Sequence, residues 1–161
     1  SASKINGFAK AALNSCLDVV SWLAPDDTVS ISVQDAVREC TGLLATSLSF
    51  RGYALRSELE PLPGLVRRPA IRNLLSAMVI HCTDQQPAPA ELVLTGAAEE
   101  GGALVAVTVR PTQGDKGIAA DLNYRKLTWE DLRALAAAEG VQMDREGDRW
   151  LLRFPWMAKS A

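Results

Sequence analysis

The spacing of hydrophobic residues changes once along this chain, at Gly52, and the change limits the folds that it can adopt. Before Gly52, apolar residues recur every three or four positions, which predicts amphipathic helices over residues 5–23 and 32–50. After Gly52, short stretches alternate apolar and polar residues, which predicts strands between further helices. We therefore expect an α+β fold with a helical hairpin in residues 1–50 and a second domain in residues 51–161.

The helical part is interpreted as two antiparallel helices. Pro25 and the two aspartates after it end the first helix, and Ser32, with Asp35 three residues on, is an N-cap for the second. Two helices alone bury too little apolar surface, so the stripe of the second helix should pack on the rest of the chain or on a second copy. We therefore expect a homodimer through the N-terminal helices. The stripe consists of Val33, Val37, Cys40, Leu44 and Leu48.

The rest of the chain mixes strands and helices. Thr128 and Asp131 form a capping pattern at the start of the last helix, and Gly140 suits the left-handed position after its end. Such elements form one mixed sheet covered by helices on one face. In order, they are a strand over 53–59, a helix opened by Pro69, a hairpin of strands 91–97 and 103–109, a loop over 111–126, the capped helix, and a closing hairpin of strands 141–145 and 150–154.

The charge and hydropathy patterns exclude several functions. The net charge is -2 at pH 7 with acids and bases interspersed, so the chain has no broad basic field for a nucleic-acid backbone. The one basic cluster, Arg67, Arg68 and Arg72, is interpreted as a solvated helix start. No apolar stretch reaches the roughly 20 residues needed to span a bilayer, and no signal peptide opens the chain, so we expect a cytoplasmic protein.

The cysteines and the histidine do not form a metal-binding pattern. Cys16, Cys40 and Cys82 are far apart in the sequence, and His81 is the only histidine. Each cysteine falls on the apolar stripe of a predicted helix, where a free thiol packs as a small hydrophobic group in a reducing compartment. We therefore expect neither a zinc site nor a disulfide, and no bound metal or cofactor.

Three local patterns occur in the order found in one protein family. Residues 71–75, Ile-Arg-Asn-Leu-Leu, look like the start of an N-box helix, and Pro87 with the strand at Leu92 falls where that helix ends and the next strand begins. The stretch from Gly140 to Pro155 looks like the family's closing glycine, hairpin and Leu-Pro-type ending. Over nearly its whole length the chain resembles the dimerisation and ATPase regions of sensor histidine kinases. The resemblance implies a helical hairpin followed by a histidine-kinase-type ATPase α/β sandwich.

The residues that bind ATP in this family are replaced here. The resemblance puts His81 at the asparagine that coordinates magnesium and Ala77 at an earlier N-box asparagine. Magnesium prefers oxygen ligands, so an imidazole weakens an ATP–magnesium site. The aspartate and glycines of the next motif are out of register in the stretch that holds Pro111, Gln113 and Asp115. These five residues are interpreted as the remnant of a nucleotide pocket.

Two residues keep alternative interpretations. His81 is either a structural histidine at the edge of a helix or a phosphoacceptor, which would need exposure and Asp84 within reach. Trp156 either packs against the domain or, if exposed beside Pro155, anchors a protein partner. Neither predicted N-terminal helix contains a phosphoacceptor histidine, and residues 124–127 lack the family's phosphate-binding glycines.

The resemblance therefore implies a pseudo-histidine kinase of bacterial two-component signalling, which acts by homodimerisation and partner binding after losing ATP binding. The expected partner is a response regulator or another signalling protein. A family of bacterial histidine phosphotransferases is similar in keeping this architecture without ATP binding. Three alternatives stay open: a divergent ATP-binding kinase with His81 near the metal, a phosphotransferase that uses His81 or an acceptor histidine outside this chain, and a purely structural docking domain.

Overall fold

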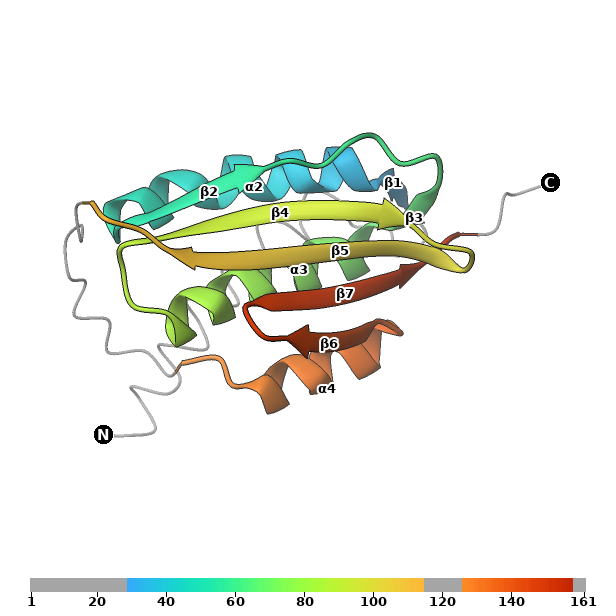
Figure 1. The fold of residues 1–161 in the computed structure, drawn as a ribbon. Helices are drawn as coiled ribbons and strands as arrows, with labels where there is room; N and C mark the ends of the chain where they lie inside the picture. The colour runs from blue at the N-terminus through green and yellow to red at the C-terminus, as the bar shows by residue number, and fades with distance from the viewer. Residues whose placement is uncertain (1–28, 115–125, 158–161) are drawn as a thin grey trace.

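The computed structural model describes residues 29–114 and 126–157, which form a sheet covered on one face by helices (Figure 1). The main sheet has five strands in the order β2-β4-β5-β7-β6, and a smaller sheet pairs β1 with β3. In Figure 1, α2 and α3 lie behind the main sheet, and α4 lies beside β6. The elements are β1 (Ser30–Ser32), α2 (Val33–Phe50), β2 (Tyr53–Ser57), β3 (Leu65–Arg67), α3 (Arg68–Gln85), β4 (Ala90–Ala98), β5 (Gly102–Pro111), α4 (Trp129–Glu139), β6 (Gln142–Glu146) and β7 (Arg149–Pro155).

The main sheet is mixed. β2 runs parallel to β4, with Tyr53 opposite Ala90, whereas the other neighbouring strands are antiparallel. A parallel pair needs a long crossover, and here the chain segment that contains β3 and α3 supplies it. The predicted fold class, an α+β chain with a mixed sheet covered by helices on one face, is confirmed. The first helix of the predicted hairpin, residues 5–23, lies outside the described residues.

Strand alternation produces the buried face of the sheet. Leu92 and Leu94 of β4 lie opposite Val109 and Val107 of β5, and all four side chains are at most 3 % exposed. Burying a large apolar side chain contributes about 1.5–3 kcal/mol, so this face and the helix that covers it hold much of the core. The helix is α3, whose fully buried residues include Ile71, Leu74, Leu75, Met78 and Val79.

Helix α2 begins and ends where the sequence predicts. The Ser32 hydroxyl accepts a hydrogen bond from the Asp35 backbone N–H at 3.2 Å, and the helix ends at Phe50 before Gly52, whose φ of 88° favours glycine. Its predicted stripe is buried in the same core as the sheet, which is one of the two outcomes expected for it. Helix α2 therefore shares one core with the described part of residues 51–161.

The start and end signals of α4 are also confirmed. Thr128 accepts from the Asp131 backbone N–H at 3.1 Å, and the Asp131 carboxylate accepts from the Thr128 backbone N–H at 3.0 Å. This reciprocal pair is a capping box, which satisfies two backbone donors that the helix leaves free. Gly140 follows the helix with a φ of 70°, a left-handed conformation that other residues rarely adopt.

The small β1–β3 sheet is absent from the sequence prediction. Each strand has only three residues, too few to show an alternating pattern, and β3 follows a stretch with prolines and a glycine that indicates a turn. Ile31 and Val66 lie opposite each other and are buried in the core. On the other edge of β3, the Leu65 carbonyl accepts a hydrogen bond from the Met157 backbone N–H at 2.8 Å.

Candidate functional site

His81 lies in the C-terminal half of α3 and is 3 % exposed. Its Nδ1 atom lies 2.6 Å from the Leu127 carbonyl oxygen, which can only accept, so Nδ1 carries the proton and donates. The imidazole centroid is 6.2 Å from the Trp129 ring and 6.4 Å from the Trp150 ring. The exposure that a phosphoacceptor role requires is therefore not met, and His81 is a packed, hydrogen-bonded side chain.

Asp84 lies one helical turn after His81 and contacts the same residue. Its Oδ2 atom accepts a hydrogen bond from the Leu127 backbone N–H at 3.1 Å. His81 and Asp84 thus bind both polar atoms of the Leu127 residue, and they fix the start of α4 against α3. Sequence reasoning paired Asp84 with His81 itself and missed this contact, because Leu127 is more than 40 residues away in the chain.

The surroundings of His81 are apolar. Trp150 is 3 % exposed, and its indole N–H has no hydrogen-bond partner among the described residues. The Arg145 guanidinium lies over the Trp150 ring, 4.5 Å from the centroid. Burial raises the pKa of the neighbouring Cys82 thiol far above its ordinary value, an effect that Arg145 partly offsets. The Cys82 thiol therefore keeps its proton in the folded protein.

The two predicted pocket-remnant residues on α3, Ala77 and His81, offer no oxygen ligand for magnesium. Ala77 is 1 % exposed and offers no polar atom, and the Nδ1 atom of His81 is already bonded to Leu127. Pro111 and Gln113 lie exposed at the end of β5, and Asp115 lies outside the described residues. Among residues 29–114 and 126–157, no group of three or more histidine, cysteine, aspartate or glutamate side chains could hold a metal ion.

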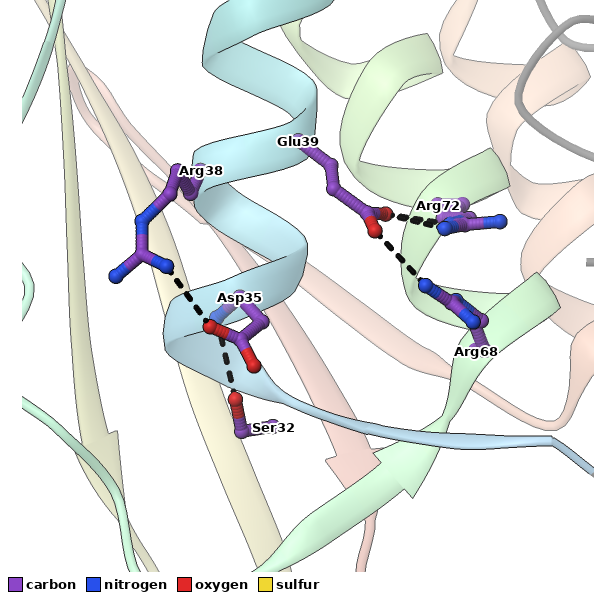
Figure 2. A network of polar contacts seen from close by, with 6 residues as sticks. All are labelled: Ser32, Asp35, Arg38, Glu39, Arg68 and Arg72. Carbon is purple, nitrogen blue, oxygen red and sulfur yellow. Dashed lines mark hydrogen bonds and ion pairs between the residues drawn. The ribbon is translucent and has the colours of Figure 1, made fainter. Parts of the chain in front are cut away.

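The N-terminal half of α3 carries a network of charges instead (Figure 2). The Glu39 carboxylate of α2 accepts from Arg68 at 2.9 Å and from Arg72 at 2.7 Å, and the Arg72 side chain is 3 % exposed. Arg67 forms an ion pair with Glu139 at the end of α4. The interpretation of these arginines as a solvated helix start is therefore wrong, because carboxylates distant in the sequence bind them at the contacts between helices.

A cleft of about 530 Å³ lies next to this network. Part of its lining is charged, with Asp35 and Arg38 forming an exposed ion pair at 3.2 Å in the first turns of α2. Leu65, which is 48 % exposed, contributes an apolar side chain from β3. The full lining is Ser30, Ile31, Ser32, Asp35, Arg38, Glu39, Leu65 and Arg68.

Trp156 packs within the domain. Its indole N–H donates to the Glu99 carbonyl at 3.1 Å, and its ring lies so close to Gly64 that any larger residue there would contact it. The ring is half-buried against the core. The exposure that would make Trp156 a free anchor for a partner is therefore not present, and the packing interpretation describes its contacts.

Solved structures with a similar fold include catalytic domains of histidine kinases. The catalytic domain of histidine kinase ThkA is 13% identical, with a TM-score of 0.61 over 80% of this chain and 95% of that one. ThkA in complex with the response regulator protein TrrA gives 11% identity and a TM-score of 0.61 over 91% of this chain and 48% of that one. A bacterial phosphotransferase gives 12% identity and a TM-score of 0.52, covering 89% and 72%.

At these identities the likeness concerns the fold alone. No family model matches the sequence, and no curated protein matches it significantly. The histidine-kinase-like ATPase fold that the resemblance implied is nevertheless borne out by the structures above. Among the described residues, no helix is both long enough and apolar enough to cross a membrane.

Proposed function

We propose that this chain is a non-catalytic module of two-component signalling, a pseudo-histidine kinase that has lost ATP binding and acts through its protein partners. The observation that carries the proposal is the double hydrogen bond of His81 and Asp84 to Leu127. In the family that the chain resembles, the position of His81 belongs to a magnesium ligand. Here the same position binds the protein's own backbone.

The donor atoms of this region support the loss of nucleotide binding. Magnesium requires hard oxygen ligands in near-octahedral geometry, and a buried imidazole whose proton is committed to a carbonyl does not supply one. Moving His81 aside would leave the Leu127 carbonyl without its donor, which costs about 1–3 kcal/mol for a buried group. A nucleotide would therefore have to displace contacts that already satisfy the protein.

We propose a response regulator or another signalling protein as the partner, because ThkA, a histidine kinase of the same fold, was solved in complex with a response regulator. We also propose a homodimer located in the cytoplasm. The stripe of α2 is buried in the domain core, so a dimer through the N-terminal part would use residues 5–23. Light scattering after size exclusion tests the dimer, and a monomer at micromolar concentration would contradict it.

Calorimetric titration with ATP or ADP and magnesium tests the central proposal. We expect no heat up to millimolar nucleotide for the native protein. The variant His81→Asn, which returns the family's asparagine, should also fail to bind, because Ala77 at the earlier N-box position still offers no polar side-chain atom. His81→Gln serves as its matched control for the loss of the imidazole. Micromolar binding by the native protein would refute the proposal and restore the divergent-kinase alternative.

Phosphotransfer is a second candidate, since a bacterial phosphotransferase has a similar fold. His81 is the only histidine of the sequence and is 3 % exposed, so an acceptor histidine would have to come from outside this chain. Incubation with a phosphorylated response regulator and detection of acid-labile phosphohistidine would test this role. Phosphohistidine that disappears in His81→Gln would support His81 as the acceptor.

A further inference from the structure

The strand β3 has little packing of its own and borders two hollows of the domain. Among the described strands it pairs only with β1, in a sheet separate from the main sheet. Leu65 is 48 % exposed and lines the cleft beside α2, whereas Arg67 lines another cavity, of about 170 Å³. Val66 is the one residue of β3 that is buried. Elements with few buried apolar contacts open more readily than the core, so β3 is suited to local opening.

Trp156 and Met157, which we call the latch, hold β3 against the main sheet. The Met157 backbone N–H donates to the Leu65 carbonyl at 2.8 Å. The Trp156 backbone N–H donates to the Gly101 carbonyl at 3.2 Å, and the indole N–H donates to the Glu99 carbonyl at 3.1 Å. The latch therefore joins β3 to the turn between β4 and β5.

Gly64, the residue before β3, is the seat of the latch. A Cβ atom at this position would lie 2.6 Å from the Cζ3 atom of Trp156, which is closer than side chains pack. The φ angle of Gly64 is not positive, so the backbone alone does not require a glycine there. The indole ring therefore occupies the space that any other residue at position 64 would need.

We propose that the latch and the small β1–β3 sheet form a unit that opens separately from the main sheet, with the Trp156 ring on Gly64 as the contact that keeps it closed. Opening breaks the backbone hydrogen bonds of the latch and exposes Ile31 and Val66, which are 6 % and 0 % exposed in the closed form. A partner that binds these apolar side chains would shift the population toward the open form. This last step rests on the partner binding proposed above, whereas the opening does not.

Native-state hydrogen exchange of the intact chain, followed by NMR, tests the opening. The hydrogen-bonded amides of the small sheet and of Met157 should exchange together, and faster than the amides paired between β4 and β5. We expect Trp156→Ala to speed this exchange about tenfold, equivalent to about 1.4 kcal/mol, and to leave the β4 and β5 amides unchanged. Trp129→Ala, the matched control at a half-buried tryptophan of α4, should leave the small sheet at its native rate. Equal acceleration of both sheets by Trp156→Ala would overturn the proposal.

A double substitution tests whether the ring on Gly64 is the contact that closes the unit. Gly64→Ala adds a Cβ that displaces the ring, so it should speed exchange in the small sheet much as Trp156→Ala does. In the Trp156→Ala background, Gly64→Ala should have little further effect, because the ring that it displaces is gone. If the two substitutions instead accelerate exchange additively, the ring on Gly64 is not the closing contact and the proposal fails.

Discussion

The two halves of α3 stabilise the domain in different ways. The N-terminal half presents arginines to carboxylates, with Arg68 and Arg72 on Glu39 of α2 (Figure 2). The C-terminal half presents His81 and Asp84 to the backbone of Leu127, inside an apolar region. One helix therefore joins α2 by ion pairs and the start of α4 by side chain to backbone hydrogen bonds.

The difference shows which contacts of α3 tolerate substitution without loss of the fold. Ion pairs between side chains tolerate few substitutions at either end, because a buried charge without its partner is costly. A hydrogen bond from a side chain to the backbone constrains only one residue type, because the backbone partner is present whatever the sequence. In the C-terminal half, the contact with Leu127 therefore requires only that residue 81 supply a donor and residue 84 an acceptor.

The largest effect is expected at the ion-paired half. Glu39→Ala removes one carboxylate from both Arg68 and Arg72, and should lower the free energy of unfolding by about 1.5–3 kcal/mol because the Arg72 side chain is only 3 % exposed. Urea denaturation followed by circular dichroism measures it. Asp35→Ala is the matched control, because its ion pair with Arg38 is exposed and should contribute less than about 1 kcal/mol. Equal losses in the two variants would remove the contrast between buried and exposed pairs.

A smaller loss of stability is expected for substitutions of His81. His81→Leu replaces the imidazole by an apolar side chain of similar volume and leaves the Leu127 carbonyl without its donor, so the free energy of unfolding should fall by about 1–2 kcal/mol. His81→Gln, which retains an N–H donor, should recover part of the loss. A leucine variant as stable as the native protein would show that the hydrogen bond contributes nothing net.

The pH dependence of the free energy of unfolding should show the burial of Cys82 in the C-terminal half of α3. Burial raises the pKa of Cys82, so the folded state keeps the thiol proton while the unfolded state loses it above about pH 8.5. The unfolded state then binds fewer protons, and stability should fall with rising pH by up to about 1.4 kcal/mol per unit between pH 9 and 10. Denaturation curves at several pH values give this slope. Cys82→Ala should flatten it, and an unchanged slope would assign it to other groups.

The smallest effect is expected at the cap of α4. Thr128→Ala removes the acceptor for the Asp131 backbone N–H and should cost about 1 kcal/mol. Thr128→Ser keeps the hydroxyl and should cost little. If Thr128→Ala lowers the free energy of unfolding by much more than about 1 kcal/mol, the cap also stabilises the contact of Leu127 with α3.

Local signals in the sequence were sufficient for most elements of the fold. Ser32, Pro69, the Thr128 capping box and Gly140 mark helix ends by chemistry within a few residues, so they could be read directly. The strands β1 and β3 were not predicted, because three residues give no period. Their pairing depends on contacts about 35 residues apart.

The site was less predictable than the fold. The sequence singled out His81, but it could not show that the imidazole bonds to Leu127 or that Asp84 shares that residue. The burial of Arg72 was missed for the same reason, since Glu39 lies 33 residues away and on another helix. Polar side chains obtain their roles from distant partners, whereas apolar periodicity and caps are local.

The strand β3 has a neighbour on each edge, and this links the stability of two segments that are far apart in the sequence. Ser32 of β1 pairs with Leu65 on one edge, and Met157 donates to the Leu65 carbonyl on the other. The first and last described segments thus meet at one end of the molecule, as Figure 1 shows. A substitution that disrupts β3 would therefore remove a backbone contact from both segments at once.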